Sequence, residues 1–428
     1  MSTTHPAAAA ATAQGTDLIT TAFLGLGTLT PDPSDMYFGF HLRMRGTGPD
    51  LETLRSHIAE RAAGIALLTH RLTLEGGGRW EPDDAFDIAC HVRQAPGDGL
   101  EPRPAQALIG TPPDESRPRW FLWLHPGDGE EWALTYLAHH AVQDATSMAH
   151  TLHTLLGPGD VPVGAAPPAR PPRGRRKATA LLPLLPDMLA TFLPRAAAPV
   201  FPESSGPRRA LGHAAVDLSL LSDMAHATGA TVNQVHIAAL ATALRRWPAT
   251  RDHADRRAWR SGPHLVVPVD LRTGPGENSA HPRGNNIGLL RVPLPRAAGD
   301  LAGRRDAMGA SLGRRYLARR RCALRTLTEH ASPRLAGWVL KRVTDPHGLL
   351  LTASQVRPVA TPSAALGAPV TEVTALPWLP PGNGCFTILT THEGVARLSV
   401  LTSSADADPQ ALARLWAAAL GADRSRLA

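Results

Sequence analysis

The chain has 428 residues, 43% of them hydrophobic, so it is long enough to form two domains with large apolar cores. Three cysteines argue against a disulfide framework and favour a reducing, cytoplasmic location. No stretch approaches the roughly 20 apolar residues of a membrane-spanning helix, and the Ala- and Thr-rich start lacks the features of a signal peptide. The net charge of +7 favours anionic partners, whereas an aromatic content of 5% and the lack of a recognised motif argue against nucleic-acid binding.

The first third of the chain predicts an α+β arrangement. Residues 37–44 alternate between large apolar side chains and others, which is typical of a strand, and Asp50 is suited to cap the helix that follows. Residues 67–74 and 79–80 predict a hairpin, and residues 121–124 predict a further strand.

The next strand, expected at residues 132–138, ends at two adjacent histidines, His139 and His140. Asp144 follows four residues after His140 and opens a helical pattern. Successive side chains of an extended backbone point to opposite faces, so the two histidines cannot both face one cavity. One of them is therefore predicted to be structural and the other available for chemistry. Their divergence, and the lack of a third ligand at helical spacing, argue against a metal site.

The composition changes after Gly157. Residues 158–209 are dense in Pro, Ala and Arg, which predicts a linker between an N-terminal lobe at residues 1–157 and a C-terminal lobe at residues 210–428. Within this linker, residues 181–193 are apolar but are interrupted by prolines. We consider three roles for them: packing between the lobes, covering the mouth of a cavity, and peripheral contact with a membrane.

The second half also alternates between strands and helices. Thr231 and Gln234 predict a capping box at the start of one helix. Asp408 and Pro409 predict the start of the last helix, and Gly421 predicts its end. The expected strands are residues 264–270, 287–292, 348–354 and 370–374, a hairpin is expected at 386–391 and 395–402, and an arginine-rich helical region at 300–327.

The histidine segment resembles the HHxxxDG signature of the CoA-dependent acyltransferase superfamily, which includes peptide-synthetase condensation domains, chloramphenicol acetyltransferase and bacterial wax ester synthase/diacylglycerol acyltransferases. His139, His140 and Asp144 match this signature, and Ala145 stands in place of its glycine. Four later segments resemble motifs of the wax ester synthase group, in their order and spacing: TVNQVHIAALATALRRW at residues 231–247, VPVDLR at 267–272, GNN at 284–286 and PPGNG at 380–384.

This resemblance implies two chloramphenicol-acetyltransferase-like lobes, with mixed sheets flanked by helices and a tunnel between them. It also implies that His140 is the catalytic residue. The donor would be an acyl thioester, carried by CoA or by a carrier protein, and the acceptor a small molecule that bears a hydroxyl or an amine. The basic charge suits CoA phosphates or an acidic carrier protein. Neither a permanently bound cofactor nor a metal is expected.

The resemblance further implies that Asp144 is structural and paired with an arginine. We expect Arg272, at the end of the VPVDLR motif, to be that partner. Asn285 and Asn286 are candidates for bridging the two lobes or lining the tunnel, although asparagines are equally typical of turns.

Two departures from the family pattern concern the tunnel. Ala145 adds a methyl group where glycine permits close approach of a thioester. Residues 352–356, TASQV, stand where the family commonly has a turn. Thr352 and Ser354 in this segment, expected at the end of a strand, are candidates for the group that stabilises the oxyanion, or are ordinary hydroxyls.

Three functions follow as hypotheses. The first is an acyltransferase that forms an ester or amide in specialised, natural-product metabolism, with His140 as the general base. The second is a wax ester synthase or diacylglycerol acyltransferase of neutral-lipid synthesis. The third is a condensation-like fold that recruits a carrier protein without catalysis or performs another reaction, and Ala145 is the feature that keeps this hypothesis open.

Overall fold

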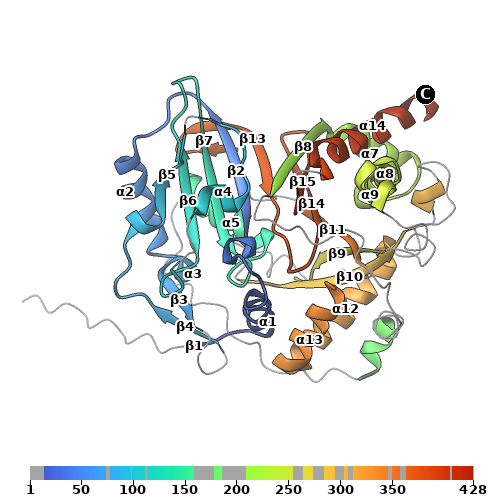
Figure 1. Ribbon diagram of the computed structural model, residues 1–428, viewed down its shortest axis with the longest axis horizontal. Coiled ribbons are helices and arrows are strands. Elements are labelled where there is room, and N and C mark those ends of the chain that lie inside the picture. The colour runs from blue at the N-terminus through green and yellow to red at the C-terminus, as the bar shows by residue number, and fades with distance from the viewer. Residues whose placement is uncertain are drawn as a thin grey trace, which may run out of the picture.

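Two six-stranded sheets form the core of the part of the chain that the computed structural model describes (Figure 1). The described residues are 14–73, 78–97, 99–110, 114–158, 178–185, 209–253, 264–272, 284–294, 303–306, 312–345, 349–356, 363–404 and 407–427. The predicted two-lobed α+β fold is confirmed.

The N-terminal sheet has the strand order β12-β13-β2-β7-β6-β5. Its strands are β2 (Tyr37–Arg45), β5 (Val92–Gln94), β6 (Trp120–His125), β7 (Glu131–His139), β12 (Ala364–Ala365) and β13 (Ala368–Leu376). Helices α2 (Leu51–Ala62) and α5 (Ala145–Leu156) pack in the large core of this lobe, together with α1 (Leu18–Gly27). The short α4 (Ala105–Ile109) packs in a separate cluster that includes residues of β6 and β7.

The C-terminal sheet has the strand order β10-β9-β11-β14-β15-β8. Its strands are β8 (Ala210–Asp217), β9 (His264–Asp270), β10 (Ile287–Pro293), β11 (Leu349–Val356), β14 (Cys385–His392) and β15 (Val395–Thr402). Helices α7 (Leu218–Ala227), α8 (Val232–Arg246) and α14 (Pro409–Leu427) share one apolar core with this sheet. Phe386 and Ile388 of β14 belong instead to the core of the N-terminal lobe, so apolar packing joins the two lobes.

The remaining elements are shorter or lie at the periphery. They are β1 (Gln14–Gly15), η1 (Pro33–Met36), α3 (Ala66–Thr69), β3 (His70–Thr73), β4 (Arg79–Pro82), η3 (Ile88–Cys90), η4 (Ala178–Leu184), α9 (Pro248–His253), α12 (Arg314–His330) and α13 (Pro333–Val343). Strands β1, β4 and β3 form a small third sheet. Among the described residues, no helix is long and apolar enough to cross a membrane.

Two adjacent strands of the C-terminal segment belong to the N-terminal sheet, which the predicted boundaries do not allow for. Strands β12 and β13 lie in the segment assigned to the C-terminal lobe, yet β13 pairs antiparallel with β2 of the N-terminal sheet. The prediction that all of residues 210–428 form the second lobe is therefore wrong for residues 364–376. Pairing between distant segments leaves no local signal in hydrophobic periodicity, which is why the sequence did not indicate it.

Several predicted boundaries also need correction. Residues 66–69 form a turn of helix, so the hairpin strand begins at His70 and not at residue 67. The last helix continues through Gly421 to Leu427, because an isolated glycine weakens a helix without ending it. In η4, Leu184 packs with residues of β9, β10 and α12. The described end of the apolar linker segment thus lies on the C-terminal lobe, while residues 186–193 and most of the linker lie outside the described residues.

Candidate active site

The two histidines face opposite sides of the N-terminal sheet, as predicted for neighbours at the end of a strand. His140 lines a cavity of about 830 Å³ whose walls come from both lobes. His139 lines a separate hollow of about 60 Å³ and accepts a hydrogen bond at Nδ1 from the N–H of Ala141, 3.1 Å away. The geometry makes His140 the histidine that is available for chemistry.

Aromatic rings enclose the imidazole of His140. The rings of Phe23 and Phe38 stack on it with centroid distances of 4.1 and 4.5 Å, and the ring of Trp378 meets it edge-on at 4.7 Å. Burial among these rings lowers the pKa of His140 to about 4, because a charged imidazolium loses its hydration there. His140 is therefore neutral at pH 7 and able to accept a proton.

The backbone around His140 is fixed by hydrogen bonds from both lobes. The N–H of His140 donates to the carbonyl of Met36 at 2.8 Å. From the other lobe, the Nδ2 of Asn285 donates to the carbonyls of His140 and Ala141, at 2.7 and 3.0 Å. The proposed bridging role of Asn285 thus has a direct structural basis.

The predicted ion pair between Asp144 and Arg272 is formed. Arg272 Nη1 lies 2.9 Å from Asp144 Oδ2, with both side chains almost completely buried, and 3.1 Å from Asp270 Oδ1. Asp144 also caps α5 by accepting from the N–H of Ser147, and it accepts from the N–H of Asn286 at 2.8 Å. This carboxylate therefore ties the helix that follows the histidines to the end of β9 and to the start of β10.

Residues of β11 form a polar wall of the cavity. Thr352 and Ser354 both line it, at alternating positions of the strand, whereas Ala353 between them lies in the core of the C-terminal lobe. Residues 352–356 pair with β14 throughout, so they form a continuous strand that ends at Val356. The expectation that Thr352 and Ser354 stand at the strand end is wrong by two or more residues.

Ala145 is the first residue of α5 and lines the cavity beside His140. A residue at this position has helical backbone angles, which any L-residue adopts, so alanine brings no backbone strain. Its methyl group narrows the cavity without filling it.

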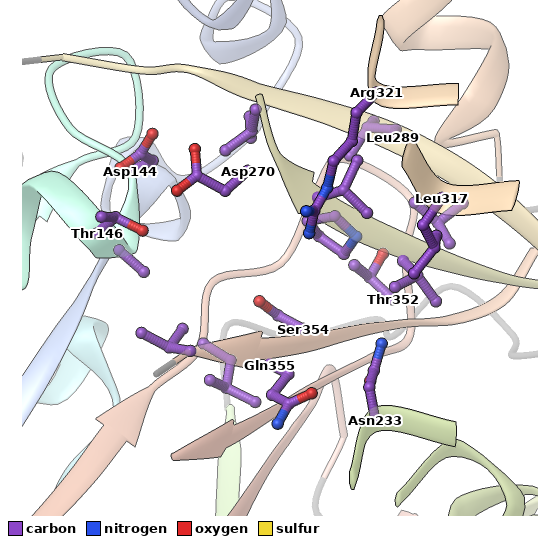
Figure 2. A pocket seen from close by; sticks show the side chains of 18 of the residues that line it. Asp144, Thr146, Asn233, Asp270, Leu289, Leu317, Arg321, Thr352, Ser354 and Gln355 are labelled. Atoms are coloured by element: carbon purple, nitrogen blue, oxygen red, sulfur yellow. The ribbon is translucent and has the colours of Figure 1, made fainter. Parts of the chain in front are cut away.

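Figure 2 shows Asp144 and Thr146 on one side of the cavity and Arg321, Thr352 and Asn233 on the other. Of these lining residues, Thr146, Arg321 and Asn233 were not found from the sequence. Phe23 and Trp378 come from segments without a motif of their own, so only the tertiary structure reveals their contact with His140. Within the described part of the chain, no group of three His, Cys, Asp or Glu side chains is suited to hold a metal ion.

The two lobes, the cavity between them and the histidine at its wall are those of a condensation-type acyltransferase fold. Residues 36–189 match the wax ester synthase/diacylglycerol acyltransferase catalytic domain. A Mycobacterium tuberculosis protein named as a diacylglycerol O-acyltransferase is 33% identical over 123 residues, 27% of each chain. Another from this organism, named likewise, is 27% identical over 243 residues, which are 47% of this chain and 50% of that protein. The chain thus matches half or less of the length of these relatives.

Solved structures share the whole fold. A wax ester synthase/diacylglycerol acyltransferase from Marinobacter aquaeolei has a TM-score of 0.57 at 17% identity, over 94% of this chain and 96% of that one. The first condensation domain of the calcium-dependent antibiotic synthetase, with a substrate analogue, has a TM-score of 0.67 at 17% identity, over 96% and 97%. Residues 36–189 are thus similar to the wax ester synthase/diacylglycerol acyltransferase catalytic domain, and the fold is shared with this enzyme and with condensation domains.

Proposed function

We propose that this protein transfers an acyl group from a thioester, on CoA or on a carrier protein, to the hydroxyl or amine of a small acceptor in natural-product metabolism. The observation that carries the proposal is the neutral, buried imidazole of His140 in the wall of a cavity between two lobes. A starter condensation domain of similar fold, with a TM-score of 0.58 at 13% identity, is described in complex with a C8-CoA thioester.

In the proposed mechanism His140 acts as a general base. Its imidazole takes the proton of the acceptor as the acceptor oxygen or nitrogen attacks the thioester carbonyl. The tetrahedral intermediate then collapses, the C–S bond breaks, and the thiolate leaves with the proton from the imidazolium. Such a positioned base contributes typically about 10²–10⁴-fold to the rate. No covalent acyl-enzyme is required.

The oxyanion of the intermediate needs a donor, and the hydroxyls of Ser354 and Thr352 supply candidates on the polar wall. A donor placed in this way contributes about 10²–10³-fold, because it is already oriented when the charge develops. Neither hydroxyl has a hydrogen-bond partner among the described residues, so both are available to donate.

The first experiment measures thioester consumption by mass spectrometry. Acyl-CoA and carrier-bound donors are offered with mixed alcohol and amine acceptors to the wild type, to His140→Ala and to His153→Ala. The last variant is the matched control, because His153 is an exposed histidine on the same segment. We expect a product that disappears with His140→Ala and persists with His153→Ala. Equal turnover by wild type and His140→Ala rules out the proposed base.

Synthesis of wax esters or triacylglycerols is the second candidate, which the match of residues 36–189 supports. Product from a fatty alcohol or a diacylglycerol, rather than from a polar acceptor, decides for it. A protein without catalysis that recruits a carrier is the third, and Ala145 supports it. This candidate predicts that wild type and His140→Ala both bind a carrier protein and that neither consumes the donor.

The proposed location is the cytoplasm, where the three cysteine thiols would stay reduced. Peripheral membrane contact near residues 181–193 remains a proposal. Leu182 and Leu185 support it, because 58% and 45% of their surfaces are exposed.

A further inference from the structure

Helix α12 turns one face toward the cavity. Of its residues, Arg314, Leu317, Ala318 and Arg321 line the cavity, at the i, i+3, i+4 and i+7 positions that share one side of a helix. Arg314 and Arg321 are thus two turns apart, about 10 Å along the helix axis. Figure 2 shows the Arg321 side chain reaching into the cavity, across from Asp144.

The described residues of the cavity do not compensate the positive charge of these two arginines. Asp144 and Asp270, the acidic residues that line it, are both bound by Arg272. Among the described residues, neither Arg314 nor Arg321 has a carboxylate partner. A guanidinium without a partner in a cavity is suited to bind a carboxylate, which it holds through two parallel hydrogen bonds.

Other lining residues of the cavity are polar as well. Asn233, at the start of α8, and Gln355, on β11, are among them (Figure 2). The Oδ1 of Asn233 and the Nε2 of Gln355 are buried, and neither has a hydrogen-bond partner in the described structure. Because buried polar atoms normally have partners, these two indicate a polar ligand that supplies them.

We propose that the substrate carries a carboxylate at the end remote from the reacting group, and that Arg321, with Arg314, determines this specificity. The substrate class is a dicarboxylic acyl thioester or a hydroxy acid or amino acid acceptor. This inference rests on the proposed function for the identity of the ligand as a substrate. The carboxylate preference itself concerns binding, which is measured without turnover.

The test uses isothermal titration calorimetry with two pairs of probes. The N-acetylcysteamine thioesters of octanoic and octanedioic acid differ only in a terminal carboxylate, and so do octanol and 8-hydroxyoctanoic acid. For each pair the ratio of dissociation constants is measured with wild type, Arg321→Gln, Arg321→Lys and Arg319→Gln. Arg319 is the matched control, because it is exposed on the same helix and does not line the cavity.

We expect Arg321→Gln to reduce the carboxylate preference about tenfold or more in at least one pair, which identifies the donor or the acceptor as its source. Arg321→Lys should keep part of it, and Arg319→Gln all of it. An unchanged ratio in both pairs with Arg321→Gln overturns the proposal, as does an equal loss with Arg319→Gln.

A third set of probes separates the carboxylate from a donor phosphate. Arg321→Gln could weaken the binding of octanoyl-CoA and octanedioyl-CoA equally and leave the ratio of dissociation constants of the two N-acetylcysteamine thioesters unchanged. In that case Arg321 binds phosphate and the proposal is wrong. His140→Ala should keep the carboxylate preference. If the wild type shows no turnover but still prefers the probes with a carboxylate, the proposed acyl transfer is wrong and the present inference is still supported.

Discussion

His140 combines two properties that its proposed role as a buried base requires. Its aromatic surroundings keep it neutral, and its backbone is held from both lobes. Since burial lowers the pKa of His140 to about 4, the base form persists far below the range of an ordinary histidine. The rate should therefore be constant from pH 7 to about pH 5 and fall only as pH approaches 4.

Single-turnover rates across this pH range check the prediction for His140. The residual rate of His140→Ala should lack the acidic limb, whereas His153→Ala should retain it. An acidic limb near pH 6.5 in the wild type would show that the catalytic histidine is solvated, contrary to the stacked environment described above.

Ser354 allows a second test at the level of one side chain. Ser354→Ala should lower turnover about 10²-fold, because it removes a donor to the oxyanion while leaving β11 intact. Its melting temperature should match that of the wild type. Unchanged turnover would eliminate Ser354 and leave Thr352 as the candidate donor.

Asn285 and Asn286 are neighbours with different roles, which provides a matched comparison. Asn285 acts through its side chain, on two buried carbonyls, whereas Asn286 donates from its backbone N–H to Asp144. Asn285→Ala should thus lower the free energy of unfolding by about 1–3 kcal/mol, and Asn286→Ala by much less. Equal losses in urea denaturation would contradict this distinction.

Residues with a local signal were predictable from the sequence, and those without one were not. The motif indicated His140 and Asp144, and the family resemblance implied an arginine partner for Asp144, expected to be Arg272; this ion pair is present in the structure. The rings of Phe23 and Trp378 could not be assigned to His140 in this way, because they reach it from distant parts of the chain.

At the level of elements, the helix starts were predictable because capping is a property of neighbouring residues. Asp50, Asp144 and the capping box of Thr231 and Gln234 all occur as predicted. The exchange of β13 into the N-terminal sheet was missed, because strand pairing depends on residues far away in sequence.

Two aspartates that cap helices allow the effect of the cap on stability to be distinguished from the effect of the ion pair. Asp50 caps α2 at the surface, and Asp144 caps α5 while also pairing with buried Arg272. Asparagine caps as well as aspartate does, so Asp50→Asn should change stability little. Asp144→Asn keeps a cap but removes one of the two carboxylates that bind Arg272 and leaves only Asp270, which should cost about 1–3 kcal/mol.

Chemical denaturation of both variants measures the difference, and turnover of Asp144→Asn measures its effect on the site. A larger loss in stability with Asp50→Asn than with Asp144→Asn would show that the cap, and not the pair, stabilises this corner of the cavity.

On the scale of the whole molecule, contacts between distant segments join the lobes. Besides β13, Arg209 at the end of the linker binds Asp35 of η1, with Nη2 2.6 Å from Oδ2. The cavity walls therefore belong to one folded unit, so a loss of global stability should remove the site as well.

Buried histidines should make this unit sensitive to acid. Burial lowers the pKa of His41 and His236 to about 3, and that of His91 and His140 to about 4. In the unfolded chain each titrates near 6.5, so between these values the unfolded state binds more protons than the folded one. Stability is therefore lost as pH falls from about 6.5 to 4, at up to about 1.4 kcal/mol per pH unit for each histidine.

His236 isolates one of these contributions. It lies against Trp416 in the core of the C-terminal lobe, and neither of its ring nitrogens has a hydrogen-bond partner among the described residues. His236→Phe replaces it with an apolar ring that does not titrate. Urea denaturation between pH 7 and pH 5 should show a shallower loss of stability for this variant than for wild type, by up to about 1.4 kcal/mol per pH unit. If the stability of wild type and of His236→Phe changes equally with pH, His236 is protonated in the folded protein and has access to water.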